Sequence, residues 1–271
     1  MTHHETKTTV ILGGEGKTGR RIGQRLMARQ MPFRMASRST PLPFDWDDET
    51  TWGPTLKGAG AVYIAYYPDL AVPSAAEQIR RLAALAIDEG VRRAVLLAGR
   101  GEPQSHPAQR ALRESGIDHT ILECAFFCQN FDEGVVVPVD DAIVFPGANI
   151  AEPFIDCDDI AEVAVAALRD PRHTNKTYDL TGPQALTFAE ATALMAAASG
   201  RPLRYVPVSF ETYAELLAPH MPEEHVGFLI ELFRDLLDGH NAHATDGVER
   251  VLGRKARDFG TYAQAAAGAW T

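Results

Sequence analysis

Three glycines in the segment LGGEGKTGRRI have a spacing that suits a phosphate-binding loop. Gly13, Gly16 and Gly19 follow a short apolar run and precede an amphipathic stretch, so they are expected at a corner between a strand and a helix. Glycine permits the tight turn there and lets the backbone approach a diphosphate. The N-terminus of the helix offers N–H groups and a positive dipole to the phosphates, and Lys17 and Thr18 could add a charge and a hydroxyl. The segment therefore predicts a dinucleotide site.

A second feature concerns which dinucleotide would bind. An acidic residue about 20 positions beyond such a loop usually binds the ribose hydroxyls of NAD. Here Ser37 and Arg38 occupy that place, and no Asp or Glu occurs between positions 30 and 43. A guanidinium matches the 2′-phosphate of NADP(H), so we expect NADP(H) rather than NAD(H), although an arginine there could also be a plain surface residue. Asp45 and Trp46, expected to follow a third strand, could lie beside the adenine, or Trp46 could belong to the core.

The elements that would position these residues alternate between apolar runs and amphipathic stretches. This alternation predicts βαβ units and an α/β Rossmann-type doubly wound parallel sheet. The expected strands are residues 8–12, 33–36, 61–65, 94–97, 120–122 and 177–180, and the expected helices are residues 17–29, 75–89, 108–114 and 158–168.

The rest of the chain predicts a smaller, mainly helical C-terminal subdomain on the substrate side. A hairpin or extended pair is expected over residues 134–144, and helices over residues 187–198, 210–217, 223–237 and 262–269. Thr187 and Glu190 form the TxxE pattern of a capping box at the start of one helix. The expected division is residues 1–131 and 155–182 for the cofactor-binding core, and residues 132–154 and 183–271 for the subdomain.

Reactive side chains are expected just beyond the strands, because ligands of open parallel sheets bind at the carboxyl ends of the strands. Tyr66 or Tyr67 could donate a proton to a substrate or pack against the cofactor. His106 could titrate near neutral pH or simply be exposed. Glu123 would be costly to bury unless it were protonated or paired with a cation such as Arg100, so it is either an ion-pair partner or an acid/base group.

Other residues of these loops are assigned by position. The cofactor is also expected to contact Ala65, Tyr67, Ala98 and Cys124. An aromatic pocket with a few polar groups would suit a small apolar or aromatic substrate. Its expected lining is Arg100, Phe126, Phe127, Gln129, Asn130 and Phe154, whereas Asp156 is expected to hold a turn or a helix start.

Composition excludes several classes of function. The chain has 26 Lys and Arg against 36 Asp and Glu, a net charge of −10, which disfavours direct binding to nucleic acid or anionic lipid. No cationic leader with an apolar stretch begins the sequence, and no run of about 18 apolar residues occurs. Three cysteines without CxxC spacing predict neither a disulfide framework nor a metal site, so a cytoplasmic protein is expected. The helix over residues 223–237 could support a homodimer, although such helices usually cover their own core.

Four stretches of the chain resemble the NmrA-like branch of the atypical short-chain dehydrogenases/reductases. They are GGEGKTGRR, RRAVLLAGRGE, ESGIDHTILECAFFCQNF, and EPFIDCDDIAEVAVAAL together with YDLTGPQALTFAEA. The resemblance implies a Rossmann domain that binds NADP(H) and a small C-terminal domain that forms one wall of a cleft. Members of this family include reductases of quinones and dyes, and non-catalytic redox sensors that regulate transcription through protein partners.

This chain departs from the family pattern at informative positions. Glu15 lies inside the loop that usually reads GATGxxG, so a carboxylate points either to the phosphates or to solvent. Ala98 replaces the serine of LLSGRGE, and Glu123 replaces an arginine. No YxxxK occurs near residues 100–115, so the usual catalytic tyrosine–lysine pair is missing.

Three functions are therefore compatible with the sequence. The first is an NAD(P)H-dependent oxidoreductase that reduces a small conjugated or aromatic substrate such as a quinone or enone, since the cofactor carries the hydride chemistry. The second is a non-catalytic NADP(H) sensor with a regulatory protein partner. The third is a non-redox isomerase or cyclase that uses Glu123 or His106 as acid or base.

Overall fold

The computed structural model describes residues 7–271, which divide into two compact units. Unit 1 contains residues 7–124, 157–180 and 247–254, and unit 2 contains residues 125–156, 181–246 and 255–271.

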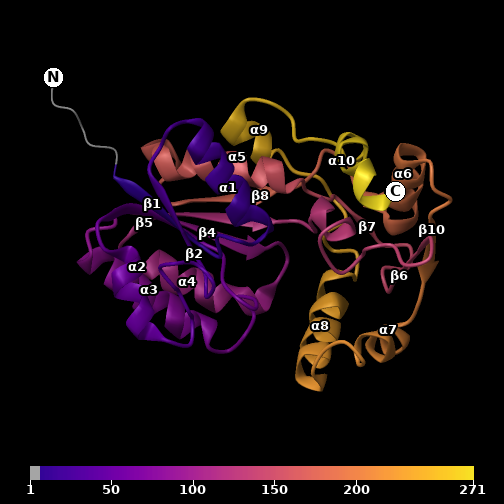
Figure 1. Ribbon diagram of the computed structural model, residues 1–271, viewed down its shortest axis with the longest axis horizontal. Coiled ribbons are helices and arrows are strands. Elements are labelled where there is room, and N and C mark those ends of the chain that lie inside the picture. Colours follow the sequence, from indigo (N-terminus) through magenta and orange to yellow (C-terminus); the bar gives the residue numbers. More distant parts are fainter. Residues whose placement is uncertain (1–6) are drawn as a thin grey trace. The chain divides into compact units, whose positions relative to one another are not determined.

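Unit 1 is built on one sheet of six parallel strands (Figure 1). In spatial order the strands are β2 (Phe33–Ala36), β1 (Thr8–Leu12), β3 (Ala59–Ile64), β4 (Arg93–Gly99), β5 (Asp118–Cys124) and β8 (Lys176–Leu180). The chain leaves β1 toward β2 and then crosses to β3 on the other side. This reversal makes the corner beyond β1 and β3 the switch point of a Rossmann-type doubly wound fold, where ligands bind. The expected parallel sheet is confirmed.

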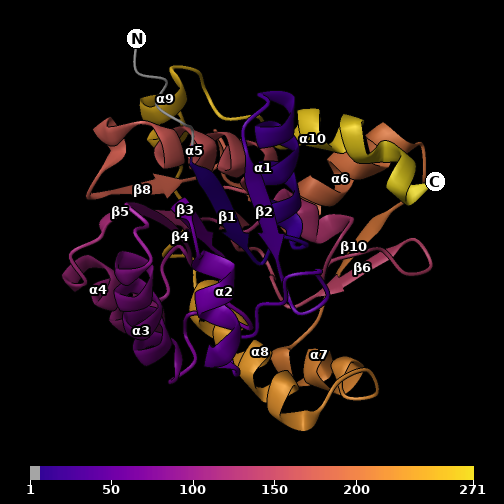
Figure 2. The same ribbon diagram turned by 60° about the vertical axis from the view of Figure 1, so that its left-hand side comes forward.

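Helices cover both faces of this sheet, as Figures 1 and 2 show. One face carries α1 (Lys17–Ala28), α5 (Cys157–Arg169) and α9 (Gly247–Leu252), and the other carries α2 (Trp52–Leu56), α3 (Ala75–Asp88) and α4 (His106–Glu114). Strands covered on both faces must be apolar along their length, and residues 10–12 of β1 are completely buried. The same reasoning explains why short apolar runs marked these strands in the sequence.

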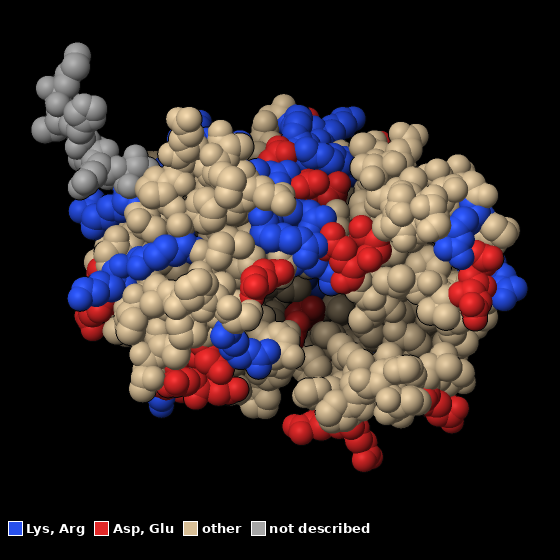
Figure 3. Space-filling model, in the orientation of Figure 1, with Lys and Arg blue, Asp and Glu red and all other residues tan. Residues whose placement is uncertain are grey.

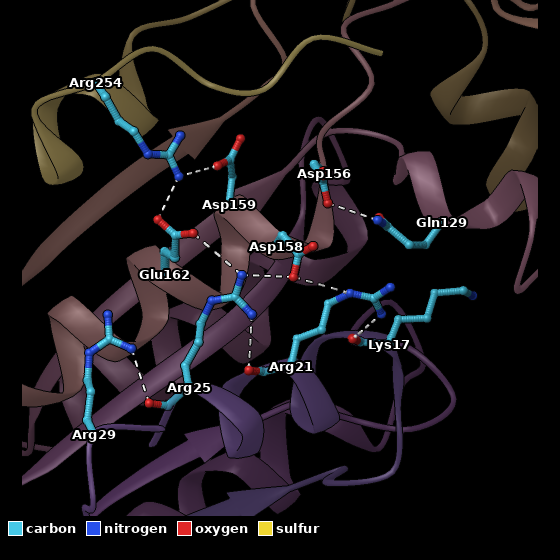
Figure 4. Close-up of polar contacts among 10 residues, drawn as sticks. All are labelled: Lys17, Arg21, Arg25, Arg29, Gln129, Asp156, Asp158, Asp159, Glu162 and Arg254. Carbon is cyan, nitrogen blue, oxygen red and sulfur yellow. Dashed lines mark hydrogen bonds and ion pairs between the residues drawn. The ribbon is translucent and has the colours of Figure 1, made fainter. Parts of the chain in front are cut away.

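An ion-pair network ties α1 to α5 and α9 (Figure 4). Arg25 Nη2 of α1 lies 2.8 Å from Asp158 Oδ1 and 3.5 Å from Glu162 Oε1 of α5. Arg254 Nη2, just beyond α9, lies 2.6 Å from both Asp159 Oδ1 and Glu162 Oε2. Asp159 is completely buried, so a cation must compensate its charge. The network fixes the helix that begins at the glycine loop.

Unit 2 is smaller and mainly helical, with two short sheets. Its helices are α6 (Phe188–Ser199), α7 (Phe210–Leu217), α8 (Glu223–Leu236) and α10 (Phe259–Ala266). The strands β6 (Ala142–Phe145) and β10 (Arg204–Pro207) pair in parallel, and β7 (Ala151–Glu152) pairs antiparallel with β9 (Leu186–Thr187). The predicted capping box is confirmed, since Thr187 and Glu190 exchange side-chain and backbone bonds at the start of α6. The core contains the closely packed rings of Phe131, Phe145, Phe154, Phe188 and Phe259.

Several sequence-based expectations about local structure are wrong. The third strand expected before Asp45 does not form, and Asp45 makes a single isolated bridge to Asp48. The hairpin expected over residues 134–144 is reduced to one bridge between Val139 and Ala142, because β6 pairs with the distant β10 instead. The short helix α2 and strand β10 were not anticipated.

The division of the chain also differs from the expected one. Residues 125–131, 155–156 and 181–182 belong to unit 2, and residues 247–254 belong to unit 1. Residues 247–254 belong to unit 1 because Gly247 packs directly against the sheet. A Cβ on Gly247 would lie 2.0 Å from the backbone oxygen of Asp179 in β8. Only glycine allows that approach, which holds the start of α9 against the end of the sheet.

Candidate functional site

The glycine loop turns tightly at the end of β1. Gly13 has a φ of +72°, and its N–H donates to the oxygen of Ala36 at the end of β2 at 3.0 Å. A Cβ on Gly13 would lie 3.0 Å from both the Cβ and the oxygen of Ala65, directly after β3. Gly16 is the N-cap of α1 and supplies no side-chain cap to the helix. The loop thus leaves a glycine-lined backbone surface at the switch point, which fits a diphosphate.

Gly19 brings α1 against this loop. A Cβ at this position would lie 2.3 Å from the oxygen of Gly13 and 2.8 Å from the Cα of Gly14. Real Cβ atoms do not approach a backbone so closely, so a larger residue would push the helix away. The third glycine therefore does what the spacing predicted: it permits close packing of the helix on the loop.

Thr18 is buried beneath the loop rather than exposed at its surface. Its Oγ1 accepts a hydrogen bond of 2.8 Å from the hydroxyl of Tyr63, a completely buried residue of β3. Burial raises the pKa of Tyr63 far above its usual value. This pair anchors α1 to the sheet, and the partner of Thr18 could not be read from the sequence. Lys17, the first residue of α1, is half-buried.

The ends of the first three strands of the chain bring five side chains together. The hydroxyls of Ser37 and Ser39, beyond β2, both donate to Oε2 of Glu15 in the glycine loop. The guanidinium of Arg38 lies over the ring of Tyr67, beyond β3, with its carbon 5.1 Å from the ring centroid. Tyr67 is 60% exposed. Tyr67, predicted as a proton donor or as a ring packed against the cofactor, therefore lies in one exposed corner with Ser37 and Arg38, the residues predicted for the 2′-phosphate.

Tyr66 points instead into the aromatic core of unit 1. Its ring centroid lies 4.4 Å from that of Trp46, and its hydroxyl bonds to Gln78 and, at 3.3 Å, to Ser74. Burial raises the pKa of Tyr66. Trp46 is 7% exposed and packs against Trp52. Its side chain therefore lies in the core of unit 1, which is one of the two places expected for it. The neighbouring Asp45 is half-buried.

The remaining predicted residues of unit 1 lie at or just beyond the ends of β4 and β5. Ala98 and Cys124 are buried, and burial raises the pKa of the Cys124 thiol. Arg100 is 5% exposed, and its Nε lies 2.7 Å from Asp179 Oδ1 of β8. The guanidinium of Arg100 is thus paired with Asp179, a partner that the sequence did not suggest. Glu123 is half-buried and lies opposite Asp179 across neighbouring strands. The predicted loop residue His106 is exposed and begins α4.

Sequence reasoning missed two carboxyls beyond β3 and β4, the half-buried Asp69 and the buried Glu102. Glu102 is 5% exposed, and its Oε2 has no hydrogen-bond partner among the described residues. Burial, together with the charge of Asp69, raises the pKa of Glu102 to about 8. Burial also raises the pKa of Asp69. The carboxyl of Glu102 occupies the space above Gly99, where a Cβ would lie only 1.8 Å from Oε1. In the sequence, the stretch GRGE over residues 99–102 was the signal that could have indicated Glu102.

The other predicted substrate residues belong to unit 2. The ring of Phe126 lies 5.9 Å from that of Phe154, centroid to centroid, inside the aromatic core. Gln129 Nε2 donates to Asp156 Oδ1 at 2.8 Å, and both residues are buried (Figure 4). This bond agrees with the structural role expected of Asp156. Phe127 forms an isolated β-bridge with Ile155, and the backbone oxygen of Asn130 accepts a hydrogen bond from the N–H of Val136.

The model of the NmrA-like family matches residues 104–264, more than half of the chain. The chain is also 30% identical to the NAD(P)H azoreductase of Xenophilus azovorans over 287 positions, covering 96% of this chain and 98% of that protein. The chain belongs to the NmrA-like family.

Solved structures share the fold of this NmrA-like protein. The Citrobacter triphenylmethane reductase complexed with NADP(H) superposes with a TM-score of 0.75 at 19% identity, covering 95% of this chain and 99% of that one. The NADPH-dependent quinone oxidoreductase of Escherichia coli, complexed with NADPH, gives a TM-score of 0.77 at 18% identity, with 95% and 99% covered. These likenesses confirm the predicted fold class.

The surface of this family member carries charges of both signs. Acidic and basic side chains lie among one another on the face shown in Figure 3, in keeping with charges spread along the sequence. Within residues 7–271, no helix is long and apolar enough to cross a bilayer, and no group of three metal-ligating side chains comes together. Cys124, Cys128 and Cys157 are buried, and no disulfide joins them.

Proposed function

We propose that this protein is an NADP(H)-dependent oxidoreductase that reduces a small conjugated or aromatic acceptor such as a quinone or enone. The observation that carries the proposal is the glycine corner at the switch point of the sheet, with Arg38 and Ser37 at the neighbouring strand end. Named relatives that are azoreductases, dye reductases and quinone reductases support the same chemistry.

Different residues of unit 1 would bind different parts of the cofactor. Backbone N–H groups at the start of α1 would hold the diphosphate, because Gly13 and Gly19 keep side chains away from it. The guanidinium of Arg38 would hold the 2′-phosphate, and the ring of Tyr67 would stabilise that guanidinium through a cation–π contact. When bound, NADPH would supply the hydride, which leaves orientation and electrostatics to the protein.

Reduction of a quinone or enone also consumes a proton. Glu102 is suited to supply it, because its carboxyl follows β4 and keeps its proton at neutral pH with a pKa of about 8. His106 and Glu123 stay as alternative acid/base predictions. A Glu102→Gln variant should retain cofactor affinity while its turnover falls, and wild-type turnover should decline above about pH 8.

The test follows the absorbance of NADPH with a panel of quinones, enones and azo dyes. Steady oxidation supports the reductase, whereas tight binding without turnover would replace it with the sensor. Conversion of an acceptor without cofactor consumption, lost in Glu123→Gln, would replace it with the isomerase or cyclase.

A charge-matched pair of variants tests the cofactor corner. Arg38→Ala should weaken NADPH binding roughly tenfold or more and leave NADH binding little changed, because a charge-assisted bond to phosphate is lost. Arg172→Ala removes the same charge from an exposed turn beside β8, at the opposite edge of the sheet, and should change neither affinity. Equal losses in both variants would refute the assignment of Arg38.

A further inference from the structure

The side chain of Glu15 is held by hydrogen bonds from the two serines that flank Arg38 in the sequence. It projects from the glycine loop to the end of β2, where one carboxylate oxygen accepts bonds from both Ser37 and Ser39. The two hydroxyls also lie 3.1 Å from each other. Both serines lower the pKa of Glu15, so its exposed carboxylate is ionised at neutral pH. The loop carboxylate thus lies at the end of β2 and stays exposed to solvent.

This arrangement sets two acceptors in competition for the same donors. On the proposed function, the 2′-phosphate of NADP(H) would bind at Arg38, flanked by the two serine hydroxyls. A phosphate carries about −1.5 to −2 charges at pH 7 and only accepts hydrogen bonds from such hydroxyls. The ionised Glu15 already takes both hydroxyls and has the same sign of charge. A ribose 2′-hydroxyl differs, since it can donate to a carboxylate.

We propose that Glu15 determines cofactor selectivity by competing with the 2′-phosphate of NADP(H) for Ser37 and Ser39. NADP(H) binds when the carboxylate releases the two serines, whereas NAD(H) binds with the carboxylate in place and donates its ribose hydroxyl to it. Arg38 attracts the phosphate and Glu15 opposes it. The two cofactors are therefore used with affinities closer together than Arg38 alone would give. This inference rests on the proposed function.

The experiment measures dissociation constants for NADPH and NADH by titration of the full-length protein. Glu15→Gln removes the charge but keeps the size of the side chain, and should tighten NADPH binding roughly tenfold while NADH binding stays constant or weakens. Glu114→Gln is the matched control, since this glutamate is exposed at the end of α4, and both affinities should stay at their wild-type values.

A second variant examines the role of the serines. In a Ser37→Ala/Ser39→Ala background the donors are absent, so adding Glu15→Gln should improve NADPH affinity by less than it does in the wild type. Folding of each variant is checked by its melting temperature.

The possible failures are distinguishable. If the wild type binds both cofactors and Glu15→Gln leaves the ratio of the two dissociation constants unchanged, the selectivity role of Glu15 is overturned. If neither the folded wild type nor any variant binds either cofactor, the proposed function itself fails.

Discussion

Replacement of Glu102 by glutamine should stabilise unit 1 at mildly alkaline pH. Glu102 is 5% exposed, and its pKa is raised from 4.5 to about 8 by burial and by the nearby Asp69. In the unfolded chain the carboxyl would ionise at its ordinary value. Between these two values the unfolded state releases a proton that the folded state retains, so rising pH favours unfolding.

The magnitude follows from that interval. The contribution of Glu102 is fully present below pH 4.5 and is lost as pH rises to about 8, after which the effect levels off. The slope is about 1.4 kcal/mol for each pH unit, so the free energy of unfolding falls by at most about 5 kcal/mol over the whole interval. Glutamine carries no charge and has nearly the same shape, so the variant lacks this slope. The gain from the substitution should therefore grow with pH up to about 8 and then stay constant.

Denaturant unfolding of the wild type and Glu102→Gln at a series of pH values between about 5 and 9 measures this effect. Both proteins carry Trp270→Phe, because Trp270 is buried in unit 2; the remaining fluorescence of Trp46 and Trp52, buried in the core of unit 1, then reports on that unit. The exposed Glu114→Gln variant controls for the loss of one charge and should follow the wild type. Parallel curves for the wild type and Glu102→Gln across this range would refute the reasoning, since they would mean that Glu102 ionises alike in both states.

Three further substitutions test the packing that supports the site. Gly19→Ala should weaken NADPH binding at least about tenfold and lower the melting temperature, because its Cβ would lie 2.3 Å from the oxygen of Gly13; unchanged titrations would contradict this. Arg254→Met should destabilise unit 1 by roughly 3 kcal/mol in denaturant unfolding, since it removes a cation from the buried Asp159, and a loss below about 0.5 kcal/mol would argue against the ion pair. Thr187→Ala should cost about 1 kcal/mol by removing the cap of α6, with circular dichroism melting as the measurement and an unshifted curve as the contrary result.

Local pattern was sufficient to predict much of unit 1. The apolar runs of β1 and the other central strands are visible in the sequence because both faces of a parallel sheet are buried. The glycine corner was predictable for a similar reason, since the positive φ of Gly13 and the contacts of Gly19 with Gly13 and Gly14 arise within one βα turn. Cap signals such as Thr187 act over four residues, and the capping box at α6 formed where it was expected.

Contacts between distant segments were decided only by the tertiary structure. Arg100 pairs with Asp179 across β5, and β6 pairs with β10 although some sixty residues separate them. Glu15 reaches Ser37 because the turn beyond β1 and the end of β2 meet at one edge of the sheet. Periodicity and turn chemistry specify which face of an element is buried and where it ends. They do not specify which charged group from another part of the chain will satisfy a given side chain, because that choice depends on strand order and packing throughout the unit.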